Sequence, residues 1–253
     1  MTSWSNPFLL FGHDMSALLA AFVILILAYG IFSLMGFGTA LLAGAPLAWV
    51  MPVAQVIPLL AVLDGVGALQ RGYRARRLVD RSSLRQLLPG MLLGQVLGIG
   101  LLTSLPLQVM AVLLGSFVAA YGAWGLRATQ AVGAGAPGWL CGAFGGVLGG
   151  LFGSGGFVYA ACLQARLADR NAFRATQAVM ISISTLWRMG LCALSGLIDK
   201  PLLMTAAVLL PAMWIGMQLG AEADRRLSDK HFGKALHVLL VLSGLALVGK
   251  GLN

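Results

Sequence analysis

The sequence predicts an all-α, polytopic membrane protein built from two inverted repeats, each with four long spans and one half-helix that follows a glycine break. The 253-residue chain is 59% hydrophobic and only 10% charged, which lies outside the range of soluble domains. Two glycine-rich breaks interrupt apolar runs, and segments of the first half recur in the second. We therefore expect a single integral membrane domain over 1–253, with repeat one at about 14–126, a linker at 127–137 and repeat two at about 138–250.

The first repeat is expected to open with a helix at 17–35 that is long enough to cross a bilayer. This apolar run ends at Gly36 and Gly38, and the apolar segment that follows, at 39–50, is too short for an ordinary span. We interpret this segment as a half-helix. Three further spans, at about 52–70, 84–103 and 107–126, complete the repeat.

The second repeat follows the same order. Its first helix, at 139–152, carries two rows of glycines at four-residue spacing, which would let neighbouring helices pack closely; the rows are Gly142, Gly146, Gly150 and Gly145, Gly149, Gly153. The helix is expected to stop at Gly153-Ser154-Gly155-Gly156, because glycine is a poor helix former. A half-helix at 157–165, spans at 175–197 and 202–221, and a last span ending near Lys250 complete the repeat.

Direct comparison of the two halves supports the duplication. The segment LPGMLLGQVLG at 88–98 matches LPAMWIGMQLG at 210–220 at six of eleven positions, with a spacing of 122. The same spacing places Gln55 on Gln177. A spacing of 117 places the first glycine break on the second. Because each copy would cross the bilayer five times if the half-helix counts as a passage, the second copy would be inverted.

The basic residues indicate the orientation. Loops at 71–85, 127–137, 166–174 and 222–234 hold 14 of the 17 Lys and Arg residues. Ten crossings place all four loops in the cytoplasm, as expected for positively charged loops, with both termini outside it. Eight spans in two parallel repeats would divide the basic loops between the two faces. The net charge of +9 therefore indicates cytoplasmic loops of a multi-pass inner-membrane protein rather than a nucleic-acid partner.

Both breaks are candidate binding elements. In a bilayer, unwound backbone survives only where it is buried in protein or lines a wet cavity. A half-helix that restarts after a break points free N–H groups and the positive end of its dipole into the gap, which favours an anion. The alternative, that both breaks are merely flexible connections, stays open. The candidate substrate-binding residues here are Gly36, Gly38, Thr39, Gly153, Ser154, Gly155 and Gly156.

Arg188 lies near the middle of its predicted span, where an isolated charge costs on the order of a few kcal/mol. It is either a direct ligand for a sulfonate or carboxylate or the ion-pair partner of Asp64, and the two roles can coexist. Asp64 is also a candidate for ion coupling. Ser184, four residues before Arg188, would supply a hydroxyl on the same face. Gln55 and Gln177, near the starts of two repeat-related helices, complete the candidate site.

These features resemble the TauE/SafE family, the sulfite exporter permeases, over nearly the whole chain. The resemblance rests on the paired glycine breaks, each followed by a short apolar segment and an Ala-containing helix start, Val53-Ala54-Gln55 and Arg174-Ala175-Thr176-Gln177. It also rests on four later glycines, Gly94, Gly98, Gly216 and Gly220. The resemblance implies transport of sulfite, sulfonates or related organic anions.

We therefore expect a transporter for small anions that works by alternating access, with its site at the paired breaks near the bilayer midplane. An uncoupled anion channel is an alternative, because it would use the same helix ends and the same central cation. An intramembrane enzyme is a weaker alternative, since the sequence pattern offers no paired carboxylates and no Ser/His/Asp or Cys/His set. The expected partners are a small anionic substrate and the lipid bilayer; no cofactor or metal is expected, and homo-oligomer formation stays open.

Overall fold

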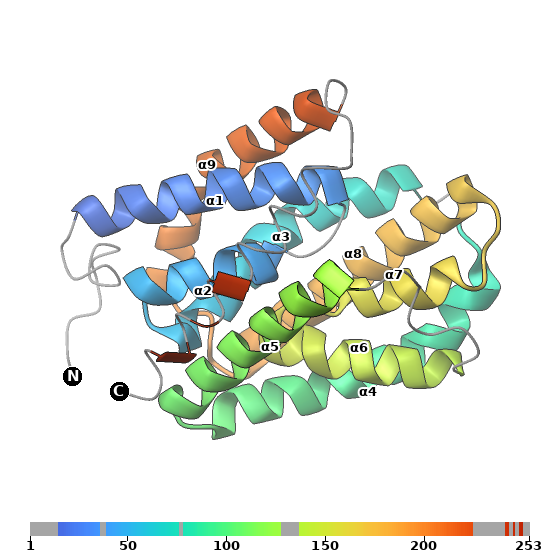
Figure 1. Cartoon of the computed structure of the whole chain (residues 1–253), viewed down its shortest axis with the longest axis horizontal. Helices are drawn as coiled ribbons and strands as arrows, with labels where there is room; N and C mark the ends of the chain where they lie inside the picture. The colour runs from blue at the N-terminus through green and yellow to red at the C-terminus, as the bar shows by residue number, and fades with distance from the viewer. Residues whose placement is uncertain are drawn as a thin grey trace. The chain divides into compact units, whose positions relative to one another are not determined.

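The computed structural model describes residues 15–35, 39–75, 78–127 and 137–224, together with 241, 242, 245, 248 and 249 (Figure 1). The predicted all-α class is confirmed within these residues, which form nine main helices. They are α1 (Met15–Met35), α2 (Thr39–Val50), α3 (Val53–Ala75), α4 (Arg81–Ser104), α5 (Leu107–Arg127), α6 (Gly138–Phe152), α7 (Gly156–Gln164), α8 (Arg170–Leu194) and α9 (Lys200–Asp224).

Four stretches of the described helices are long and apolar enough to cross a membrane: Met15–Ser33, Arg81–Ser104, Arg170–Leu194 and Lys200–Ala223. Shorter apolar helical stretches lie at Ala54–Ala68, Gln108–Ala120 and Gly138–Phe152. This pattern is that of a polytopic membrane protein. Most of the predicted linker and most of the predicted last span lie outside the described residues.

Two boundaries predicted from the sequence are wrong. Helix α8 begins at Arg170 rather than at 175, because the Asp169 carboxylate caps it by accepting hydrogen bonds from the backbone N–H groups of Asn171 and Ala172, at 3.3 and 3.0 Å. The basic segment predicted as a loop at 71–85 is also largely helical, since α3 continues to Ala75 and α4 starts at Arg81. Many of the arginines therefore lie on helix ends rather than in loops.

The chain forms two compact units, each of which contains helices from both predicted repeats. One unit comprises Met1–Leu59, Leu105–Ala128 and Ile198–Asn253, and its described part holds α1, α2, the start of α3, α5 and α9. The other comprises Leu60–Ser104 and Thr129–Leu197, and holds the rest of α3 with α4, α6, α7 and α8. The candidate site belongs to this second unit, which we call the α4–α8 unit.

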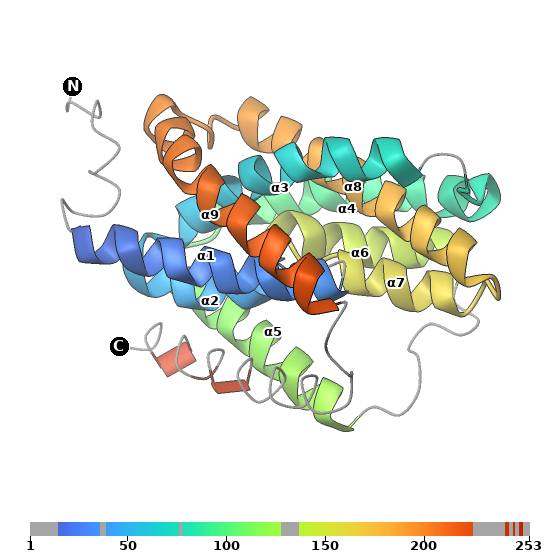
Figure 2. The same ribbon diagram turned by 90° about the horizontal axis from the view of Figure 1, so that it is seen from above.

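Within the α4–α8 unit, α4 and α6 lie side by side and run in the same direction (Figures 1 and 2). Their backbones touch because glycines face carbonyl groups on both sides. A Cβ atom placed on Gly98 would lie 2.5 Å from the carbonyl oxygen of Val147, and one placed on Gly150 would lie 2.7 Å from that of Gln95. Such close approach is possible only without side chains, so these glycines set the helix separation.

The other unit contains a matching contact between α1 and α9, which cross closely in Figure 2. Gly216 and Gly220 of α9 face the carbonyl oxygens of Ile26 and Gly30 in α1. In the α4–α8 unit, Gly94 and Gly98 of α4 face those of Ala143 and Val147 in α6. The glycines are related by a spacing of 122 and the carbonyl groups by a spacing of 117, the same two spacings that relate the sequence halves.

The second glycine break reverses the chain. Gly153 ends α6 with φ of 70°, a left-handed conformation that glycine adopts readily, and its N–H donates to Gly149 O while that of Ser154 donates to Leu148 O. Helix α7 then runs back along α6, because Gly149 faces Gly155 and Gly145 faces the ring of Tyr159. One glycine row of α6 thus faces α4 and the other faces α7.

One end of the α4–α8 unit, which we call its basic end, carries Arg81, Arg85, Arg166, Arg170 and Arg174. Hydrogen bonds connect the helices at this end. The Arg166 guanidinium, beyond the end of α7, donates to the Gln86 side chain near the start of α4 at 2.5 Å. The backbone N–H of Asp80, before α4, donates to the Thr176 hydroxyl of α8 at 2.8 Å. A Cβ atom on Gly138, at the start of α6, would lie 2.8 Å from Arg166 Nη1. The starts of α4, α6 and α8 therefore lie at the same end of this unit.

Candidate functional site

The site is centred on a buried ion pair. Arg188 Nη2 lies 3.1 Å from Asp64 Oδ2, and the two residues are only 3% and 5% exposed. Arg188 comes from the last third of α8 and Asp64 from α3, 124 residues earlier. The Met189 side chain of α8 reaches α3 here, since a Cβ atom on Gly65 would lie 2.8 Å from Met189 Sδ. The ion pair with Asp64, one of the two roles considered for Arg188 from the sequence, is therefore present in the structure.

Arg188 also contacts the helix that ends at the glycine break. Its Nη1 donates to the carbonyl oxygen of Gly149 at 3.4 Å. Because Gly149 has no side chain, α6 can approach the residue before α7 closely here. A Cβ atom on Gly149 would lie 3.6 Å from the backbone nitrogen of Gly155, which directly precedes α7. The guanidinium therefore contacts a residue of α6 that faces the start of the half-helix.

Gln95 and Ser184 extend this polar cluster. The Gln95 side-chain N–H group donates to the Ser184 hydroxyl oxygen at 2.5 Å, and both residues are buried. Gln95 lies on α4 and faces Gly149 of α6: a Cβ atom placed on Gly149 would lie 3.1 Å from the Gln95 Nε2 atom. Ser184 lies one helical turn before Arg188, so α8 presents both side chains on one face. The sequence predicted that Ser184 and Arg188 share a face of α8. The structure adds Gln95 of α4 as a hydrogen-bond partner of Ser184.

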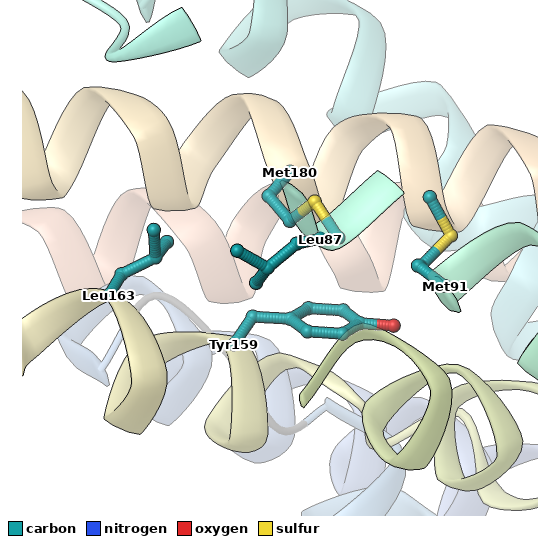
Figure 3. Packing of buried hydrophobic residues seen from close by; sticks show 5 residues of the cluster. All are labelled: Leu87, Met91, Tyr159, Leu163 and Met180. Atoms are coloured by element: carbon teal, nitrogen blue, oxygen red, sulfur yellow. The ribbon is translucent and has the colours of Figure 1, made fainter. Parts of the chain in front are cut away.

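Tyr159 of α7 completes the cluster. Its ring packs with Leu87, Met91 and Met180, and Figure 3 shows its hydroxyl at the Met91 end of this apolar group, away from Leu163. The hydroxyl oxygen would lie 3.0 Å from a Cβ atom on Gly155. It approaches Ser184 without adopting hydrogen-bond geometry. An apolar wall thus directs this hydroxyl toward the break.

Three side chains of this cluster carry buried polar atoms without a hydrogen-bond partner. In the part of the chain that the structure describes, such atoms are Gln55 Oε1, Gln95 Oε1, Tyr159 Oη and Arg188 Nε. The last three belong to the cluster formed by Asp64, Gln95, Gly149, Gly155, Tyr159, Ser184 and Arg188, which we call the Arg188 cluster. Buried polar groups are normally hydrogen-bonded, so a concentration of unpaired ones indicates a place where a polar ligand can bind.

The remaining predicted site residues divide into three groups. Gly36 and Gly38 lie outside the described residues. Thr39, the buried first residue of α2, and Gln55, in the first turn of α3, belong to the other unit. Gln177 is buried in α8 but lies eleven residues before Arg188, about three helical turns away.

At the second break, the predicted residues form the turn itself. The Ser154 hydroxyl donates to the carbonyl oxygen of Phe152 at 3.2 Å and so stabilises the turn. Gly153 provides the left-handed residue, Gly155 precedes α7, and Gly156 is the first residue of α7. Of these, Gly155 is the one that belongs to the Arg188 cluster.

Gln95 and Tyr159 were not predicted. A signal for Gln95 was present, since it is a polar residue in an apolar segment whose second copy has Met217 at the same place. Tyr159 gave a weaker signal, because a tyrosine in a short apolar segment is equally typical of helix packing. Neither could be assigned to the site without knowing which helices pack together.

Comparison with known proteins agrees with this architecture. Residues 20–247 match the family model described as "Sulfite exporter TauE/SafE". The chain is also similar to the "Probable inner membrane transporter protein TsaS" of Comamonas testosteroni, with 30% identity over 193 residues, covering 75% of this chain and 81% of the relative. No solved structure matches the chain significantly.

Proposed function

The chain belongs to the TauE/SafE sulfite exporter family, and we propose that it transports sulfite or an organosulfonate through a site at the Arg188 cluster. Membership makes the protein a membrane transporter rather than an enzyme. The relative from Comamonas testosteroni is named as a probable inner membrane transporter, which supports placing this chain in the inner membrane as a multi-pass protein.

The observation that carries the proposal is the group of unpaired polar atoms around Arg188. Among the described residues, Arg188 is the buried cation, and its Nε has no hydrogen-bond partner. A guanidinium offers planar N–H donors that suit the oxygens of a sulfonate or sulfite. The nearby start of α7 adds backbone N–H groups and the positive end of a helix dipole, both of which favour an anion.

Two inverted repeats explain the matching helix contacts. The contacts of α4 with α6 and of α9 with α1 use glycines and carbonyl groups at the same two sequence spacings. A duplicated structural unit would produce this agreement, because equivalent helices would pack in equivalent ways. We therefore infer that α1 corresponds to α6 and that α4 corresponds to α9.

The basic end of the α4–α8 unit supports the inverted topology. The starts of α4, α6 and α8 lie together there, as the Arg166–Gln86 and Asp80–Thr176 hydrogen bonds require. Eight spans with re-entrant half-helices would place the start of α8 on the face opposite to the starts of α4 and α6. Ten passages place all three on one face, which the positive-inside rule assigns to the cytoplasm, with both chain termini outside it.

Alternating access is the mechanism that such a pair of repeats favours. A site at Arg188 would open to one side and then to the other as helices move, and the reversal at Gly153 would let α7 shift relative to α6. A small anion bound at Arg188 would then cross without a continuous pore.

Counterflow in proteoliposomes tests this function. Vesicles loaded with unlabelled sulfite or methanesulfonate would receive a trace of the labelled anion outside, with the membrane potential held at zero by valinomycin and equal K⁺ concentrations on both sides. Under this clamp a transporter accumulates label transiently inside the vesicles, whereas an uncoupled channel dissipates the gradient without this overshoot. We expect an overshoot with the wild-type protein.

Variants of α8 test the site. Arg188→Lys keeps the charge but loses the planar donors, so uptake should fall at least about tenfold. The matched control is Arg174→Ala, which removes an exposed arginine from the same helix and should transport normally. Equal uptake by wild type and Arg188→Lys would exclude a direct role for the guanidinium, and absence of flux with every sulfonate tested would exclude the proposed substrates.

A further inference from the structure

The Arg188 cluster has no net formal charge. Among the residues that the structure describes, Asp64 and Arg188 are the only charged side chains classed as buried. They pair at 3.1 Å, so one positive and one negative charge cancel. The other buried polar members of the cluster, Gln95, Tyr159 and Ser184, are uncharged side chains.

This balance limits the charge of an anion that the cluster can accept. Arg188 can turn an unpaired N–H group toward one anionic group while it keeps its contact with Asp64. Backbone N–H groups at the start of α7 and the Gln95 amide can share that single negative charge. A second negative charge would find no further buried cation among the described residues and would lie close to the Asp64 carboxylate.

From this balance, we propose that Asp64 determines charge selectivity, so that the site binds singly charged sulfonates, or sulfite in its singly charged hydrogensulfite form, and rejects dianions such as sulfate. The inference deepens the proposed function, because it depends on anion binding at Arg188. Asp64 would act through Arg188 and through its own field, without touching the substrate. It is therefore a positioning and specificity residue.

The geometry of the ion pair favours a role of Asp64 in charge selectivity over a purely structural role. A structural pair would be expected to satisfy the guanidinium completely, as buried ion pairs need further hydrogen bonds to offset the cost of removing them from water. Here Arg188 Nε stays unpaired, and its Nη1 contact with Gly149 O is long at 3.4 Å. Asp64 neutralises the cation without using all of its donors, which leaves donors for one anionic group.

Methanesulfonate and sulfate provide a matched pair of probes. Both are tetrahedral, and they differ by the replacement of one charged oxygen with a methyl group. Their dissociation constants for purified protein would be measured by titration at constant ionic strength. For the wild type, we expect methanesulfonate to bind at least about tenfold more tightly than sulfate, since one uncompensated charge in a site of low dielectric costs that much or more.

The Asp64→Asn variant keeps the shape and an acceptor oxygen but gives the cluster a net positive charge. Its preference for methanesulfonate over sulfate should fall by about tenfold or more, or reverse. Asp64→Glu, which keeps the negative charge at this position, should keep the wild-type preference for methanesulfonate over sulfate. This second variant and the wild-type ratio test the inference even where Asp64→Asn does not fold.

The outcomes separate the inference from the proposed function. Tighter binding of sulfate than of methanesulfonate to the wild type would overturn the charge rule, as would an unchanged preference in a folded Asp64→Asn protein or a lost preference in Asp64→Glu. In each case the anion site itself would stand. Binding of neither anion to the wild type would overturn both the inference and the site at Arg188.

Discussion

The energetic coupling of Asp64 and Arg188 can be predicted from their burial. Both residues are at most 5% exposed, and the pair distance is 3.1 Å. Removing one partner leaves the other charge buried and unpaired, which typically costs about 3–5 kcal/mol. Replacing both partners with neutral groups of similar shape removes this penalty, so the double variant should be destabilised less than either single variant.

The experiment is a double-mutant cycle with Asp64→Asn, Arg188→Gln and the combination. Free energies of unfolding would come from reversible denaturant titration in mixed micelles. We expect each single variant to lose about 3 kcal/mol and the pair to show a coupling energy of more than about 3 kcal/mol, so that the double variant loses less than either single one. The control Arg174→Gln, on an exposed position of the same helix, should change stability by no more than about 0.5 kcal/mol.

Two results would refute this reasoning. Additive effects of the two substitutions would mean that the contact contributes nothing specific to folding. Single variants that each lose less than about 1 kcal/mol would mean that water reaches the pair, as at an exposed ion pair. In that case the dielectric constant around Arg188 would be high, and the charge selectivity assigned to Asp64 would weaken with it.

Three further predictions concern packing and the site. Gly94→Ala and Gly216→Ala should each destabilise the protein by about 1–3 kcal/mol, because the new methyl group meets a carbonyl oxygen of the neighbouring helix; Gly190→Ala, in a helix position with nothing within 4 Å, should instead stabilise it by up to about 1 kcal/mol in thermal unfolding. Gln95→Met, which copies the residue of the other repeat, should keep stability within about 1.5 kcal/mol yet weaken methanesulfonate binding in the same titration, and unchanged affinity would remove Gln95 from the site. Asp169→Ala should cost about 1 kcal/mol in thermal unfolding by removing the N-cap of α8, and an unaltered unfolding temperature would contradict that capping role.

The sequence was sufficient for the parts of the fold that depend on local pattern. The glycine rows of α6 follow a four-residue period, so their use as packing surfaces could be predicted from spacing alone. The break at Gly153 was predictable because its glycines disfavour helix. By contrast, the start of α8 depends on one capping residue, Asp169. Because the neighbouring arginines indicated a basic loop at 166–174, this cap was not recognised from the sequence.

The site was harder to predict because its members come from helices that are distant in sequence. Asp64 and Arg188 could be matched because each is a rare charge within an apolar span. Gln95 becomes meaningful only when α4 is known to pack against α6 in the register that places it beside Gly149. Sequence periodicity fixes the face of a helix but not its neighbour, so Gln95 and Tyr159 were missed.

The polar residues of the Arg188 cluster break the symmetry that the glycines preserve. At the spacing of 122, Arg188 corresponds to Val66, Asp64 to Leu186, Ser184 to Val62 and Gln95 to Met217. At the spacing of 117, Tyr159 corresponds to Leu42. The positions that hold helices together are thus duplicated, whereas each polar position of the site has an apolar counterpart. In the pair of repeats that we propose, Asp64 comes from the first and Arg188 from the second, so relative motion of the repeats would act directly on the contact between these two residues.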